Sequence, residues 1–286
     1  MTTSNDSAHH ENSYFSDQES GAEMARLLDQ DRLMTRSMGG LFSERSDLAG
    51  IHRLLDIACG PGGWALEVAY SDPALEIVGI DVSQQMIEHA RVQAQVQGLH
   101  NASFLLMDAL QPLEFPSESF DLVNIRLLGF LPPDAWPRLL QECLRVTRPG
   151  GIFRWTESEV VTSNSAAVEK MWSWFALSLK RAGQSFSPDG RLFSLTPVMK
   201  LLLRQAGYRN IQHQAHVFEG SVGTETHDGF CRDLRFAFKL FQPFFLSVGV
   251  TTQEEVDQVY EQMLVDLLKE DFCAMQFLLT VWGEKP

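Results

Sequence analysis

The chain has 286 residues, of which 44% are hydrophobic, and this size indicates one globular domain, or one domain with a cap. The formal net charge of −14 argues against a nucleic-acid partner, because phosphate binding requires a basic face, and it favours a small-molecule ligand. We find no apolar signal segment near the start and no run apolar enough for a membrane span, so we expect a cytoplasmic protein.

The cysteines show neither Cys-x-x-Cys spacing nor a histidine at metal-site spacing. We therefore expect reduced thiols and no metal site. The partners expected are a small-molecule acceptor and, as an open option, a second copy of the chain. The cysteines in question are Cys59, Cys143, Cys231 and Cys273.

After a polar start and a helix expected at 21–36, residues 54–64 carry the most informative pattern. An apolar strand reaches Asp56, the chain turns through Gly60 and Gly62, and a helix follows at 64–70. Such a turn lets backbone N–H groups approach a ligand at the positively polarised start of a helix. The sequence therefore predicts a ligand site at this turn.

The next strand, 76–81, ends at Asp81, about twenty residues past Gly62, where a dinucleotide-type fold places the acid that accepts both ribose hydroxyls. Ser83 is expected to cap a helix at 84–97. Further strands are expected at 102–107, 120–125 and 151–156, with a helix at 136–145 before the last of them.

Strands that alternate with helices predict a parallel sheet with right-handed crossovers. Ligands of such sheets bind beyond the carboxyl ends of the strands. Asp56, Asp81, Asp108 and Asn124 all fall at those ends.

Five ordered motifs within residues 51–157 resemble the class I S-adenosylmethionine-dependent methyltransferases, in particular the small-molecule branch of the ubiquinone and menaquinone biosynthesis enzymes. The resemblance implies a Rossmann-like α/β fold, with a seven-stranded, mostly parallel sheet, helices on both faces and helical cap insertions. It also implies S-adenosylmethionine as methyl donor and S-adenosylhomocysteine as product. The motifs are residues 55–63, 78–83 (with Met86, Ala90 and Arg91), 107–109, 115–123 and 142–151, and residues 195–218 also follow the family pattern.

The resemblance divides the chain into a cofactor-binding core and additions to it. We expect an N-terminal helical segment at 1–50 that covers the cofactor, the core at 51–157, and the rest of the core sheet at 195–218 and 274–286. A helical cap insert at 158–194 and a helical lid insert at 219–273 are the departures from a minimal fold. The lid insert is expected to form helices at 227–245 and 252–271.

Cofactor contacts follow from the same resemblance. Asp56 fixes the turn or reaches the ammonium group of the donor through water, and Asp81 accepts the ribose hydroxyls. Asp108 accepts from the exocyclic amine of adenine, with Ala109 close by. The remaining contacts expected are Ala58, Cys59, Gly60 and Gly62 at the methionine part, Val82 and Met86 beside the adenine, and Asn124 and Arg126 at the methionine end or the acceptor.

Arg126 is unusual, because the family commonly has a small or uncharged residue there. Anchoring the cofactor carboxylate, binding an acidic acceptor and pairing with Glu157 are the three roles left open for it. A general base is needed for a hydroxyl acceptor, and less so for an activated carbon or an amine. The candidates for that base are Glu157, His213, His216 and His227.

The function predicted is methyl transfer to a small, apolar or aromatic metabolite through an oxygen, carbon or nitrogen atom, by in-line displacement. A nicotinamide enzyme is disfavoured, since Ala65 breaks the Gly-x-Gly-x-x-Gly spacing. A cofactor-binding scaffold with repurposed chemistry stays as the alternative. The aromatic stripe of the lid insert lines the acceptor pocket, packs the insert onto the sheet, or forms a dimer interface; it comprises Phe230, Phe236, Phe238, Phe241, Phe244 and Phe245.

Overall fold

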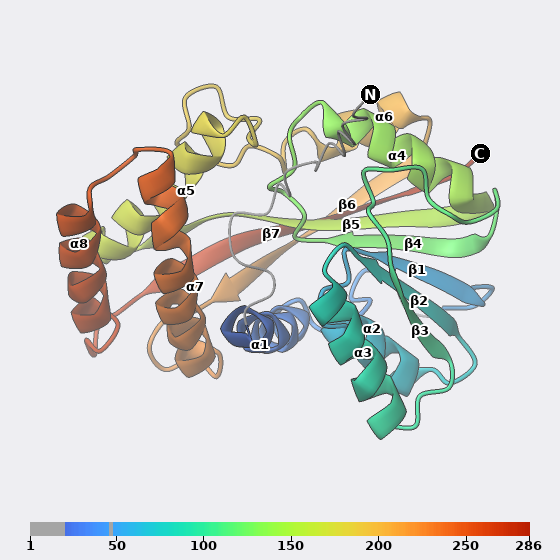
Figure 1. Cartoon of the computed structure of the whole chain (residues 1–286), viewed down its shortest axis with the longest axis horizontal. Coiled ribbons are helices and arrows are strands. Elements are labelled where there is room, and N and C mark those ends of the chain that lie inside the picture. Colours follow the sequence, from blue (N-terminus) through green and yellow to red (C-terminus); the bar gives the residue numbers. More distant parts are fainter. Residues whose placement is uncertain (1–20, 46–47) are drawn as a thin grey trace, which may run out of the picture.

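The computed structural model describes residues 21–45 and 48–286, and its centre is a seven-stranded sheet (Figure 1). The strand order is β3-β2-β1-β4-β5-β7-β6, in which β7 runs antiparallel to both of its neighbours and the other pairs are parallel. The mostly parallel α/β fold predicted from the sequence is therefore confirmed. The strands are β1 (Arg53–Ile57), β2 (Glu76–Asp81), β3 (Ala102–Leu106), β4 (Phe120–Arg126), β5 (Thr147–Ser163), β6 (Arg209–Glu219) and β7 (Ala274–Glu284).

Helices cover both faces of the sheet (Figure 1). On one face, α2 (Gly63–Ser71) and α3 (Gln84–Val96) share an apolar core with β1 and β2. On the other face, α4 (Ala135–Val146) and α6 (Met199–Ala206) pack together over β5 to β7. The predicted cap of α3 is present, because Ser83 Oγ accepts a backbone N–H at 3.3 Å.

Strand β5 is longer than the segment 151–156 predicted from its apolar run. The extension pairs antiparallel with β7 as far as Ser163, opposite Ala274, across an irregularity between Ser158 and Val161. The pairing partner therefore sets the length of this strand. The extended part carries the sheet towards the helices that lie beyond the core.

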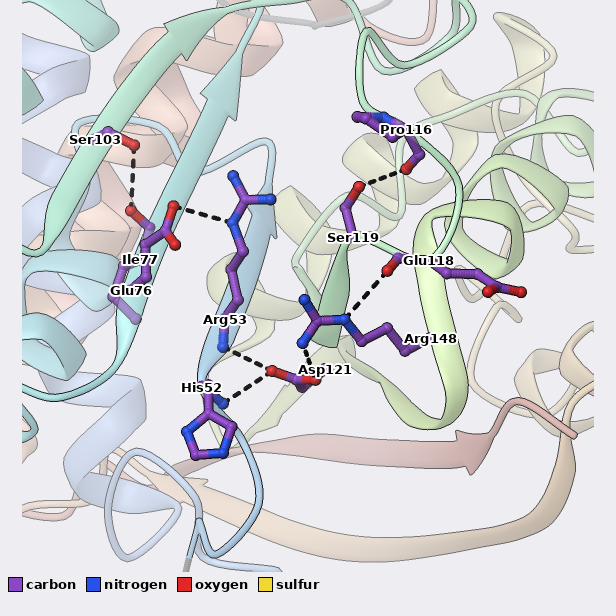
Figure 2. A network of polar contacts seen from close by, with 10 residues as sticks. All are labelled: His52, Arg53, Glu76, Ile77, Ser103, Pro116, Glu118, Ser119, Asp121 and Arg148. Atoms are coloured by element: carbon purple, nitrogen blue, oxygen red, sulfur yellow. Dashed lines mark hydrogen bonds and ion pairs between the residues drawn. The ribbon is translucent and has the colours of Figure 1, made fainter.

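The amino ends of three strands are joined by a polar network on the edge away from the predicted ligand site (Figure 2). Asp121, at the start of β4, accepts the backbone N–H groups of His52 and Arg53, both at 2.9 Å. Its other carboxylate oxygen lies 2.6 Å from Nη1 of Arg148, which belongs to β5. The family motif around Arg148 thus has a structural role here.

Four further helices, all expected from the sequence, lie outside the core sheet. Three of them gather at one end of the sheet, and α1 lies between them and α2 (Figure 1). Their apolar side chains form a second core together with residues of β5, β6 and β7. The last helix ends five residues before the predicted end at 271. The four are α1 (Gly21–Ser37), α5 (Ala166–Arg181), α7 (His227–Ser247) and α8 (Gln253–Asp266).

Candidate functional site

The turn between β1 and α2 has a backbone that only small residues permit. Gly60 and Gly62 have φ angles of +54° and +82°, in the left-handed region that favours glycine. A Cβ atom on Gly62 would lie 2.9 Å from the Cβ of Ala90 and 3.1 Å from the ring of Phe104. A Cβ atom on Gly60 would meet nothing within 4 Å, so that side of the turn is open.

Asp81, at the end of β2, is fixed against this turn. One carboxylate oxygen accepts the backbone N–H of Gly60 at 2.9 Å, and the other accepts the N–H of Ser83 at 2.9 Å. The residue is buried and lines a cavity that opens from the turn. The two bonds hold the carboxylate where a ligand beyond the strand ends meets it.

A buried polar chain lies behind the turn. Asp56 Oδ1 accepts the side-chain N–H of Asn124 at 2.7 Å, and Asn124 Oδ1 accepts Nη1 of Arg154 at 2.9 Å. Nε of Arg154 lies 2.5 Å from Oε1 of Glu44. The sequence led us to expect Asn124 at the cavity, but its side chain does not line it. It is fully buried and orients Asp56 instead.

The cavity has a volume of about 310 Å³, within the range of small-molecule sites. It brings together ten of the twelve residues predicted to bind the cofactor, and Asn124 and Gly62 are the two that do not line it. Gly62 contributes the shape of the turn. The ten are Asp56, Ala58, Cys59, Gly60, Asp81, Val82, Met86, Asp108, Ala109 and Arg126.

Arg126, at the end of β4, is paired with the N-terminal helix. Its Nη2 lies 3.3 Å from Oδ1 of Asp31, and its Nη1 donates to Oγ1 of Thr35 at 3.0 Å. Burial lowers the pKa of Arg126, and burial raises the pKa of Asp31. Asp56 lies in the same cluster, and burial raises its pKa to about 7. Sequence analysis missed Asp31, because a carboxylate on an amphipathic helix is usually solvated.

Glu157 is the only residue among the base candidates that lines the cavity in the described part of the chain. Its Oε1 accepts the backbone N–H of Leu128 at 2.9 Å and Nε1 of Trp155 at 2.8 Å. Burial nevertheless raises the pKa of Glu157 to about 8, which makes the neutral acid the main form at pH 7.

The three histidines predicted as alternative bases do not line the cavity. His213 is exposed on β6, with Nδ1 3.0 Å from Nζ of Lys200. The ring of His227 lies 2.9 Å from the carbonyl oxygen of Gly220, at the start of α7. Burial lowers the pKa of His216, also on β6. None of the three is placed to take a proton from a ligand in the cavity, so we do not retain them as bases.

We call the part of the cavity walled by α1, α5 and α7 its far lobe, and most of its lining is apolar or aromatic, although Arg26, Gln30 and Asp233 of these helices also line the cavity. The rings of Phe175 and Phe241 stack there, with centroids 4.8 Å apart and an interplanar angle of 16°. Of the predicted aromatic stripe, only Phe230 and Phe241 line the cavity, whereas Phe236 is 50% exposed. The other three phenylalanines pack within the second core. The apolar lining comprises Leu27, Met34, Leu127, Leu128, Phe130, Leu131, Trp172, Phe175, Leu179, Phe193, Leu195, Phe230, Leu234, Ala237 and Phe241.

Comparison with known proteins places this chain in a family. A family described as "Methyltransferase domain" matches residues 54–151. The ubiquinone/menaquinone biosynthesis C-methyltransferase UbiE of Geobacter sulfurreducens is 32% identical over 179 residues, which cover 58% of this chain and 68% of the relative. The chain belongs to the class I S-adenosylmethionine-dependent methyltransferases.

Two other comparisons define the extent of this likeness. Matches to the demethylmenaquinone methyltransferases of two Geobacillus species span only 42% of the relatives' length. The structure of a Haemonchus contortus phosphoethanolamine N-methyltransferase 2 is similar in fold, with a TM-score of 0.56 and 17% identity over 96% of this chain and 60% of that one. The structure of the [4+2]-cyclase SpnF is also similar in fold. It has a TM-score of 0.50 and 24% identity, and the match covers 94% of this chain and 97% of that one.

Membership in this methyltransferase family, of class EC 2.1.1.-, implies S-adenosylmethionine as the methyl donor, and the residues of the site fit this cofactor. The glycine turn is open where a Cβ on Gly60 would stand, and carboxylates at the ends of β1 and β2 suit a donor with cationic groups. Among the described residues, none of the helices has the length and apolarity needed to cross a bilayer.

Proposed function

We propose that this methyltransferase transfers its methyl group to a small, largely apolar metabolite that carries an aromatic ring. The observation that carries the proposal is the apolar, aromatic lobe, which is continuous with the cofactor end of the same cavity. Stacked rings such as Phe175 and Phe241 provide flat apolar surfaces against which a planar acceptor packs. The helices α1, α5 and α7 contribute to the walls of this lobe, and we infer that they act as its lid.

The cofactor contacts are proposed from position. The backbone of Ala58, Cys59 and Gly60 faces the methionine part, and Asp81 accepts the ribose hydroxyls. Asp108, whose Oδ1 accepts the N–H of Leu110 at 2.9 Å, is positioned for the exocyclic amine of adenine. We place the adenine ring between Val82 and Met86, with the small residue Ala109 beside it.

The bound donor supplies a methyl group that is already activated for in-line displacement. The protein then has mainly to hold the acceptor atom in line with that methyl group, which contributes up to roughly 7–11 kcal/mol. An apolar lobe under a lid also excludes water from the reacting atoms. For a hydroxyl acceptor, the ionised form of Glu157, which is the minor form at pH 7, takes the proton as the oxygen attacks; an activated carbon or an amine does not require this step.

A panel of acceptors tests this proposal. We expect methyl transfer from labelled S-adenosylmethionine to phenols or quinols, and not to fatty acids or small polar amines. Phe241→Leu is expected to raise the acceptor KM about tenfold, because it removes part of an aromatic wall, without changing the affinity for S-adenosylhomocysteine. Phe236→Leu, on the same helix but exposed, is the matched control and leaves both values unchanged.

The same panel distinguishes a second candidate function. One structure of similar fold is titled as a [4+2]-cyclase, so the fold alone does not fix the reaction. Cofactor binding without transfer to any acceptor of the panel favours a scaffold with repurposed chemistry. Transfer only to polar amines or fatty acids contradicts the aromatic-acceptor proposal.

Glu157 also gives a prediction about stability. Burial raises the pKa of Glu157 in the folded protein to about 8. The neutral side chain therefore contributes fully to the free energy of unfolding at a pH below the pKa of Glu157 in the unfolded chain, and this contribution is lost as the pH rises through about 8. Glu157→Gln stays neutral at every pH. The melting temperature of the variant relative to the parent is therefore expected to rise between pH 5 and pH 9, on the order of 5 °C. A pH-independent difference in thermal unfolding experiments contradicts the assignment of a buried neutral acid.

A further inference from the structure

We propose that Asp31 of the N-terminal helix binds the amino-acid end of the methyl donor and of its product, together with Asp56 and Arg126. The proposal rests on the cofactor site of the proposed function and extends it to a residue outside the core. The three side chains come from α1, β1 and β4, and all of them line the cavity beside the glycine turn.

Asp31 is held at the turn by two contacts. Its carboxylate accepts the backbone N–H of Trp64, in the first turn of α2. It also pairs with Arg126, whose Nη2 lies 3.3 Å from Oδ1. The approach is so close that a Cβ atom on Gly63 would lie 2.7 Å from Oδ2 of Asp31. This glycine therefore leaves room for a carboxylate that reaches the cofactor end from another helix.

The charges of the cluster are complementary to an amino acid. Two carboxylates and one guanidinium, when ionised, leave a net charge of −1 beside a buried turn. A carboxylate accepts the N–H groups of an ammonium, and buried charges of this kind require a partner. Burial raises the pKa of both carboxyl groups, and a cation placed beside them favours their ionised forms.

Arg126 provides the complementary half of the site. The residue is 9% exposed, and within the described part of the chain its Nε and Nη2 have no hydrogen-bond partner, although Nη2 is ion-paired with Asp31. Buried guanidinium N–H groups without an acceptor favour a ligand carboxylate. The planar guanidinium can bind such a carboxylate through two parallel N–H···O hydrogen bonds. The ammonium of the ligand then lies with Asp31 and Asp56, and its carboxylate lies with Arg126.

Three ligands that share the adenosine part separate these contributions. S-adenosylhomocysteine carries both charged groups, its decarboxylated amine carries only the ammonium, and methylthioadenosine carries neither. For Asp31→Asn, calorimetry is expected to show about tenfold weaker binding of the first two, because a charge-assisted bond is lost, and unchanged binding of methylthioadenosine. Arg126→Met is expected to weaken only S-adenosylhomocysteine.

Asp29→Asn is the control, because Asp29 lies on the same helix but faces Arg32 and Arg232 at the surface. This variant is expected to bind all three ligands as the parent does. An equal loss of affinity for all three ligands in Asp31→Asn identifies a merely structural carboxylate and overturns the proposal, as does unchanged or tighter binding of S-adenosylhomocysteine. A parent protein that binds none of the ligands instead overturns the cofactor site itself.

Discussion

Asp81→Ala is expected to weaken binding of S-adenosylhomocysteine by about 100-fold or more. The variant loses the proposed ribose contacts, two charge-assisted hydrogen bonds that each contribute roughly 1.5–3 kcal/mol. It also loses the two bonds of 2.9 Å that hold the N–H groups of Gly60 and Ser83, so the turn itself is less well fixed. Isothermal titration calorimetry measures the change directly.

Two variants make this result interpretable. Asp81→Asn keeps the volume and one acceptor oxygen, so its loss of affinity is expected to be smaller than that of the alanine variant. Glu88→Ala removes an exposed carboxylate from the helix that follows Asp81, and it is expected to bind the ligand as the parent does. If Asp81→Ala also binds like the parent, the ribose assignment is wrong.

Arg154→Met is expected to lower the free energy of unfolding by about 3–5 kcal/mol. Arg154 and Glu44 form an ion pair in which both side chains are 1% exposed, and removal of one partner leaves the other charge buried and unpaired. For a chain of this size the melting temperature falls by about 10 °C. Affinity for S-adenosylhomocysteine falls as well, because Arg154 holds Asn124, which in turn holds Asp56.

A second substitution tests whether the unpaired charge of Glu44 causes the lower stability of Arg154→Met. The double variant Glu44→Gln with Arg154→Met carries no unpaired charge and is expected to recover most of the stability. Arg36→Met is the matched control, since its ion pair with Glu225 is short but exposed, and it is expected to cost no more than about 1 kcal/mol. If the double variant is no more stable than Arg154→Met, then lost packing and not the buried charge explains the effect.

Much of the fold was predictable because local patterns and pairing agree. Apolar runs that end in Asp56 and Asp81 became parallel strands, and Ser83 caps the helix that follows. The length of β5 was not predictable, because its last seven residues are extended only by pairing with a strand more than a hundred residues away. Periodicity describes a segment alone and carries no information about such a partner.

The candidate site was predictable where a residue acts from a strand end, and less so elsewhere. Asn124 lies at the expected place along its strand, but it bonds to Asp56 rather than facing the cavity. His213 and His227 are residue types that suit catalysis, yet their distance from the cavity depends on the packing of β6 and α7. Asp31 is the opposite case: its position depends entirely on how α1 docks beside the turn.

A crystal structure of the protein with S-adenosylhomocysteine tests the central claim most directly. We expect the ribose hydroxyls within hydrogen-bond distance of Asp81, the amino-acid end between Asp31, Asp56 and Arg126, and the sulfur atom directed towards the aromatic lobe beside Glu157. A ligand bound outside this cavity contradicts our account. So does a ligand in the reverse orientation, with its adenine ring in the aromatic lobe.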